Sequence, residues 1–186
     1  MIWVVVVGVV VVLIALIGLL SSRQLRSRRL KARFGPEYDR ALAHTGDQHA
    51  AERELLERRQ RHQQFELRPL DPAIRGRFGE RWQAAQRHFI DEPVVAVAEA
   101  DDLVRQAMQG RGYPVDEDFE RRAADLSVDH PTVVDNYRAA HAISIRARRG
   151  QATTEELRQS MVHFRALFDE LLTASDSTRG RSASRV

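Results

Sequence analysis

Residues 153–172, TTEELRQSMVHFRALFDELL, carry the clearest structural signal in the chain. Large apolar residues recur there at every third or fourth position, which is the spacing of one face of an α-helix. Thr153 and Glu156 have the spacing of a capping box, which begins a helix. We predict a helix that packs into the core of the domain, with docking on a partner as the alternative. Its apolar face consists of Leu157, Met161, Phe164, Phe168 and Leu171.

Working outward from this helix, the same periodicity predicts three more long helices and one short helix. The short helix is expected to begin after Asp116 as N-cap and to end near Leu126, and Pro131 is expected to open the longer helix that follows. Together these helices predict an all-α bundle domain over residues 72–173, which is long enough to enclose one core. The long helices are predicted at residues 72–89, 93–109, 131–149 and 154–173.

At the other end of the chain, residues 2–20, IWVVVVGVVVVLIALIGLL, contain no charged side chain. As a helix they would span roughly 28 Å, close to the thickness of a bilayer's hydrocarbon core. The run is longer than the apolar part of a signal peptide, and no small-residue cleavage site follows it. We therefore predict a single-pass transmembrane helix, with residues 1–20 as the anchor.

A basic segment follows the apolar run, because residues 21–33 hold six basic side chains and no acidic one. The positive-inside rule then predicts a bacterial plasma (inner) membrane protein with its N-terminus outside and its C-terminal domain in the cytoplasm. We expect the segment to be a juxtamembrane helix that ends before Gly35 and contacts the anionic headgroups of the lipid bilayer. The predicted membrane-surface residues are Arg23, Arg26, Arg28, Arg29, Lys31 and Arg33.

Two polar regions complete the predicted organisation. Residues 34–71 are expected to form a short helix after Pro36, a polar stalk helix over residues 48–64 with Asp47 as N-cap, and an extended strap. Residues 174–186 are rich in serine and arginine and have no large apolar group except the final valine. We predict that they form a disordered basic tail.

The charge distribution argues against a nucleic-acid partner. The net charge is +3, yet residues 34–173 hold 20 arginines against 25 acidic residues. Proteins that bind nucleic acid present a basic face, whereas the excess of positive charge here lies beside the predicted membrane helix. We therefore expect the lipid bilayer and an unidentified protein as partners, and no nucleic acid.

Enzyme signatures are missing from the sequence. It has no glycine-rich phosphate loop, no G-x-S-x-G, no H-E-x-x-H and no cysteine, and these motifs mark common catalytic and metal sites. Neighbouring residues on a helix point about 100° apart, so Glu99, Asp101 and Asp102 are expected to be solvated and paired with arginines rather than to bind a metal. We expect no catalytic residues, no metal and no cofactor.

A candidate ligand pocket is expected where two loops flank the short helix. His141 follows Tyr137 by one helical turn on an apolar face, so it is either a hydrogen-bonded core histidine or a proton-responsive or ligand-binding group. Capping and turn chemistry is the alternative explanation for the polar loop residues. The candidate residues are Tyr113, Asp129, His130, Asn136, Tyr137, Arg138 and His141.

Several segments resemble a family of bacterial single-pass membrane-anchored proteins that is common in high-GC bacteria. The resemblance implies an anchored helical domain and carries no known activity. It rests on RFGPEYDR at residues 33–40, RGYPV at 111–115, RAADLSVDHP at 122–131, NYRAAH at 136–141 and ELRQSMVHFR at 156–165.

Three functions fit these features. The first is a membrane-tethered adaptor whose helical bundle binds a partner protein, since bundles offer grooves for amphipathic helices. The second is a small-ligand or pH-sensing domain with a pocket around Tyr137, His141 and His130. The third is an envelope protein that responds to anionic lipid through residues 21–33.

Overall fold

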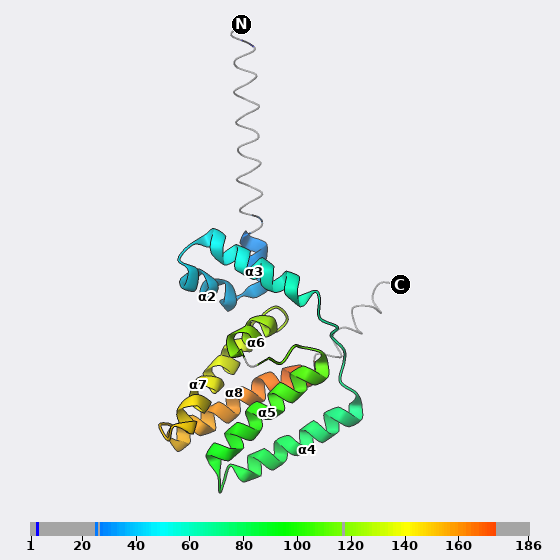
Figure 1. The fold of residues 1–186 in the computed structure, drawn as a ribbon, viewed down its shortest axis with the longest axis vertical. Coiled ribbons are helices and arrows are strands. Elements are labelled where there is room, and N and C mark those ends of the chain that lie inside the picture. Colours follow the sequence, from blue (N-terminus) through cyan, green and yellow to red (C-terminus); the bar gives the residue numbers. More distant parts are fainter. Residues whose placement is uncertain (1–2, 4–24, 26, 117, 174–186) are drawn as a thin grey trace. The chain divides into compact units, whose positions relative to one another are not determined.

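A computed structural model of the chain describes residues 3, 25, 27–116 and 118–173 (Figure 1). All regular secondary structure in these residues is helical, which confirms the predicted all-α class. The chain divides into two compact units between Glu57 and Arg58. Each unit is described by itself.

The predicted transmembrane helix over residues 2–20 lies outside the described residues, apart from Trp3. The same holds for Arg23, Arg26 and the predicted tail at residues 174–186. Among the residues that the structure does describe, no helix combines the length and the apolar character needed to cross a membrane. The membrane anchor therefore stays a prediction from the sequence.

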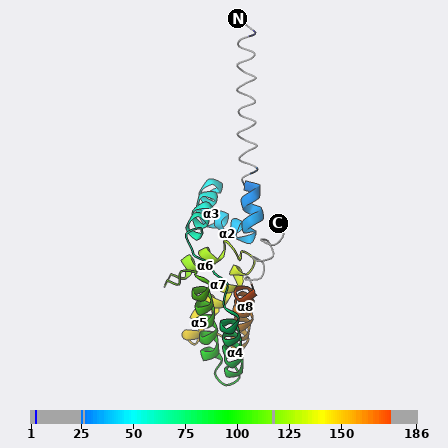
Figure 2. The same cartoon turned by 90° about the vertical axis from the view of Figure 1, so that its right-hand side faces the viewer.

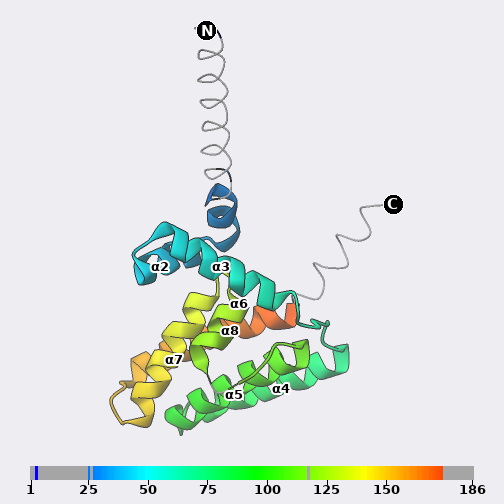
Figure 3. The same cartoon turned by 45° about the horizontal axis from the view of Figure 1, so that its top comes forward.

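The first unit contains the helical residues 27–34, helix α2 (Pro36–Thr45) and the first part of helix α3 (Gln48–His62). Figure 3 shows α2 and α3 joined by a tight turn. Gly35 separates the first two helical stretches with a φ of +49°, and Pro36 then begins α2. Asp47 caps α3 as predicted, since its carboxylate accepts a hydrogen bond of 2.8 Å from the amide of Ala50.

The interior of this unit combines apolar side chains with two buried carboxylates, those of Glu37 and Glu52. Glu52 is only 8% exposed and accepts hydrogen bonds from the hydroxyls of Ser27 and Tyr38 at 2.5 and 3.2 Å. The predicted lipid-contacting side chains that fall within the described residues are exposed. They are Arg28, Arg29, Lys31 and Arg33.

The second unit contains the bundle. Helix α5 packs against α4, α7 and α8, and α8 also packs against α7. Figure 1 shows α5 beside α4, and Figure 2 shows the same pair after a quarter turn. The short helix α6 contacts α7 (Figure 3). The helices are α4 (Pro72–His88), α5 (Pro93–Arg111), α6 (Phe119–Leu126), α7 (Val134–Arg148) and α8 (Thr154–Thr173).

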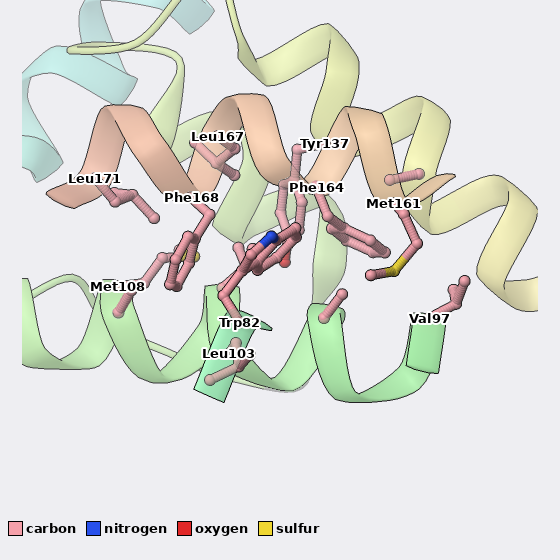
Figure 4. Packing of buried hydrophobic residues seen from close by; sticks show 14 of the residues in the cluster. Trp82, Val97, Leu103, Met108, Tyr137, Met161, Phe164, Leu167, Phe168 and Leu171 are labelled. Carbon is pink, nitrogen blue, oxygen red and sulfur yellow. The ribbon is translucent and has the colours of Figure 1, made fainter. Parts of the chain in front are cut away.

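Aromatic side chains fill the centre of the bundle (Figure 4). The indole of Trp82 stacks on Phe168 with 4.8 Å between the ring centroids, and Phe78 meets Phe168 edge-on at 6.2 Å. All five residues of the predicted apolar face of α8 are buried in this core. The interpretation of that face as a core face is therefore confirmed.

Helix starts follow the predicted caps at some positions and differ at others. The predicted capping box at the start of α8 is formed. The carboxylate of Glu156 accepts a hydrogen bond of 2.8 Å from the amide of Thr153, and the amide of Glu156 donates one of 3.2 Å to the hydroxyl of Thr153. The prediction that Asp116 caps α6 is wrong: the carboxylate of Asp118 accepts from the amide of Arg121 at 3.2 Å. Pro131 does not begin α7, since residues 131–133 form a turn first.

The extended strap before α4 belongs to the bundle. Leu70 is buried in its core, and Phe65 and Leu67 pack against that core. The backbone amide of Arg68 donates a 2.9 Å hydrogen bond to the carbonyl of Arg111. The strap therefore runs directly past the end of α5, and this end is where the candidate site begins.

Candidate functional site

A cluster of polar side chains is centred on Asp129, in the loop between α6 and α7. Its Oδ2 atom lies 2.7 Å from Nε2 of His62 and accepts a 2.9 Å hydrogen bond from the hydroxyl of Tyr113. His62 is the last residue of α3, and Tyr113 follows α5. One carboxylate thus joins three segments that are far apart in the sequence.

These contacts determine the protonation states of Asp129 and Tyr113. Burial acts to raise the pKa of Asp129, but the hydrogen bonds with His62 and Tyr113 outweigh it, so this pKa lies below its ordinary value. Burial raises the pKa of the Tyr113 hydroxyl, and the adjacent Asp129 carboxylate raises it further. Tyr113 therefore remains a hydrogen-bond donor to an ionised Asp129 at neutral pH.

His130 lies next to this group and is only 4% exposed. Its Nδ1 atom is 3.3 Å from Oε1 of Glu170 on α8, and its Nε2 atom has no hydrogen-bond partner among the described residues. Burial lowers the pKa of His130, against the attraction of Glu170 and Asp129. The imidazole is therefore held neutral at pH 7 inside the bundle.

The last turn of α3 is attached to the same loop by further polar contacts. The guanidinium of Arg61 forms an ion pair of 2.7 Å with Asp125, whose carboxylate is almost fully buried. Arg58 donates to the hydroxyl of Ser127 at 3.4 Å. Together with the pair of His62 and Asp129, these bonds fasten residues 58–62 to the end of α6.

The remaining predicted site residues lie in other surroundings. Tyr137 is fully buried and packs on Phe119 and Phe164 at 4.8 and 6.3 Å. The imidazole of His141 stacks on Phe119 with 3.6 Å between centroids. Arg138 forms an ion pair with Glu120, and Asn136 contacts His163.

Of the predicted pocket residues, then, the structure brings Tyr113, Asp129 and His130 together, and it gathers Tyr137 and His141 around Phe119. The Nδ1 atom of His141 has no hydrogen-bond partner among the described residues. Burial lowers the pKa of His141, and Asp101 partly offsets this effect.

Asp101 is buried, so the prediction of a solvated side chain at this position is wrong. It is only 8% exposed, and its Oδ1 atom has no hydrogen-bond partner in the described part of the chain. Burial raises its pKa, against the attraction of Arg105 and His141. The predicted pairing with an arginine holds for Asp102, which lies 2.7 Å from Arg105, whereas Glu99 pairs with His88 at 3.1 Å instead. The spacing of Asp101 from buried Val97 and Val104 was the signal of its burial.

An apolar surface groove runs between α4 and α8, with a volume of about 290 Å³. The buried indole of Trp82 lies at this groove, under the guanidinium of Arg165, whose carbon is 5.4 Å from the ring centroid. Val162 is 52% exposed, although it is large and apolar. We call this feature the α4–α8 groove; it is lined by Trp82, Gln86, Phe89, Arg158, Met161, Val162 and Arg165.

The α4–α8 groove was not predicted from the sequence. Trp82, Phe89 and Met161 lie on the apolar faces that were expected to form the core, and the periodicity cannot tell a covered face from a partly open one. Val162, beside Met161, was the available signal, because it widens the apolar face of α8 toward the surface.

Comparison with protein families, curated proteins and solved structures yields no match. The family resemblance noted in the sequence therefore stays a prediction. In the described ranges, no three histidine, aspartate or glutamate side chains come together as a metal site requires. Any functional conclusion rests on the geometry of the polar cluster and of the α4–α8 groove.

The opposite pKa shifts of Asp129, which is partly exposed, and of buried Asp101 predict opposite effects of the same substitution. Asp129→Asn removes a carboxylate with a lowered pKa, so it should destabilise the protein at pH 7, and this loss should shrink as the pH falls below about 4 toward the lowered pKa of Asp129. Asp101→Asn removes a carboxylate with a raised pKa, so its effect should become more favourable as the pH rises from 3 to 7.

Chemical denaturation of both variants at pH 3 and pH 7, each relative to the unsubstituted protein, measures these effects. Equal pH dependence of the two variants would contradict the assigned environments.

Proposed function

We propose that the protein is a membrane-tethered interaction module whose bundle binds a partner protein in the α4–α8 groove. The observation that carries this proposal is the groove itself: an open apolar site with exposed Val162 at its edge. Val162 is exposed and Phe89 is partly exposed at this site, so apolar side chains of a partner would remove them from water. The proposed activity is binding, not catalysis.

The tethered part of the proposal rests on the sequence of residues 2–20 and on the basic residues after it. The helical residues 27–34 expose Arg28, Arg29 and Arg33, and each basic side chain near an anionic membrane gains roughly 1 kcal/mol. We propose a bacterial inner-membrane location with the bundle on the cytoplasmic side. A tether raises the effective concentration of the bundle for partners at the membrane surface.

A second candidate function is pH sensing, and one observation favours it. His130 is buried and neutral, and its Nε2 atom lacks a hydrogen-bond partner among the described residues. Protonation would place a charge between Asp129 and Glu170, which would change the contacts of the α6–α7 loop. The groove supports binding more directly, because it provides a surface that a partner can reach.

Site-specific photo-crosslinking in cells tests the proposed function. A benzophenone amino acid at Val162 on α8, and separately at Gln86 on α4, is expected to crosslink to the same protein, since both side chains line the groove. The matched control is the same amino acid at Ala142, an exposed position on α7, which should capture no such protein. Deletion of residues 1–20 should weaken the crosslink by removing the proposed tether while keeping the helical residues 27–34.

The test is specific to the groove because it requires the same protein to crosslink to both walls, through Val162 on α8 and Gln86 on α4. Crosslinks from Val162 and Gln86 to unrelated proteins, or the same pattern from Ala142, would contradict the proposal.

A further inference from the structure

The charged side chains of the α4–α8 groove have one sign and lie on one wall. The α4 wall consists of Trp82, Gln86 and Phe89, which follows the last residue of α4, and it is uncharged, whereas Arg158 and Arg165 lie on α8. These arginines are seven residues apart, which is two helical turns or about 10 Å. Val162 lies between them and is exposed. The groove thus offers an apolar floor with two cations along one edge.

Arg165 uses only one of its three guanidinium nitrogens in a hydrogen bond among the described residues. Its Nε atom donates to Oδ2 of Asp169 at 2.6 Å, while its two terminal nitrogens make no hydrogen bond among the described residues. The carbon of the guanidinium lies 5.4 Å from the ring centroid of Trp82, and this cation–π contact favours its position over the ring. A guanidinium fork held in this way matches the geometry of a carboxylate.

Arg158 is engaged more fully, but by an exposed partner. Its Nε and Nη2 atoms donate to Glu155 at 2.8 and 2.6 Å, and both side chains are more than half exposed. An ion pair of this kind within one helix contributes only about 0.3–0.5 kcal/mol, so a carboxylate from a partner can share or replace it. The Nη1 atom of Arg158 also remains available.

The length of the groove sets the size of its occupant. The residues of the α4 wall have the spacing i, i+4, i+7, the last being the C-cap residue Phe89, and those of α8 have i, i+3, i+4, i+7, so each wall presents about two helical turns. An amphipathic helix that fills such a groove inserts apolar side chains at the same spacings. Its flank toward α8 would meet Arg158 and Arg165.

We propose that the α4–α8 groove binds an amphipathic helix of a partner protein that carries two carboxylates, about two turns apart, along the flank facing α8. This inference rests on the proposed function and adds the chemical class of the partner. The apolar stripe supplies contact area, and the carboxylates bind Arg158 and Arg165. The two arginines on the α8 side determine the orientation of the bound helix in the groove.

Two labelled helical peptides with the same leucine stripe test the inference against the full-length protein in detergent. One peptide carries two glutamates on one flank, two turns apart, and the other carries lysines there. Fluorescence anisotropy should show that the glutamate peptide binds about tenfold more tightly, as expected for two exposed ion pairs. Arg158→Glu with Arg165→Glu should reverse the preference.

Two further variants keep the result interpretable. Arg158→Gln with Arg165→Gln should abolish the preference without introducing repulsion from Glu155 and Asp169. Arg87→Glu with Arg149→Glu changes the charge equally at exposed positions outside the groove and should leave the preference intact.

Each failure has a distinct meaning. Equal affinity for both peptides would overturn the acidic flank and leave the groove as a binding site. No binding of either peptide would overturn both the inference and the groove as a helix site. Crosslinks between two copies of the chain through Val162 would assign the groove to self-association instead and overturn the inference.

Discussion

Replacing Trp82 with alanine is expected to lower the free energy of unfolding by about 3–5 kcal/mol, the range for truncating a large buried aromatic side chain. Trp82 is 1% exposed and stacks on Phe168, which joins α4 to α8. Because α4 otherwise packs on α5, loss of the indole leaves a cavity between α4 and α8. The same substitution should remove the floor of the α4–α8 groove and abolish peptide binding.

Urea denaturation of the full-length protein, followed by circular dichroism, measures this effect. Gln86→Ala, an exposed substitution one turn further along α4, is the matched control and should change stability by no more than about 0.5 kcal/mol. A loss below about 1 kcal/mol for the Trp82 variant would show that α4 is not held to the bundle through this side chain.

Gly112→Ala is expected to destabilise the bundle by about 3 kcal/mol or more. Gly112 has a φ of +93°, and a Cβ atom there would lie 2.4 Å from the backbone carbonyl oxygen of Glu66. The left-handed conformation alone costs an L-residue about 1–2 kcal/mol. The clash adds to this cost, because the strap would have to move away from the end of α5 and uncover Leu70.

Gly150→Ala separates the cost of the left-handed backbone conformation from the cost of the steric clash. Gly150 also has a positive φ, of +69°, but a Cβ atom there would meet nothing within 4 Å. Its alanine variant should therefore lose only about 1–2 kcal/mol. Thermal unfolding of both variants gives the comparison, and equal losses would mean that the strap is free to shift.

The helices of the bundle could be predicted from the sequence because their signals are local. Apolar periodicity and the capping box of Thr153 and Glu156 depend on residues within a few positions of each other. The start of α6 was misplaced because Asp116 and Asp118 are both aspartates, which are favoured N-cap residues. Only the packed structure selects Asp118.

The candidate sites were harder to predict because they depend on contacts between distant segments. Nothing near Asp129 in the sequence indicates His62, which lies in a different helix, as its partner. The burial of Asp101 and the stacking of His141 on Phe119 likewise depend on how α5, α6 and α7 meet. The α4–α8 groove depends on the spacing between two helices, which no single-helix pattern contains.

The position of Trp82 also gives the protein a built-in optical probe. The chain has two tryptophans, Trp3 and Trp82, so in a Trp3→Phe variant all indole emission comes from the groove. The ring of Trp82 lies between the aromatic face of Phe168 and the charge of Arg165. An occupant that draws this cation toward its own carboxylates alters the electric field at the indole, and the emission spectrum then reports occupancy without any attached dye.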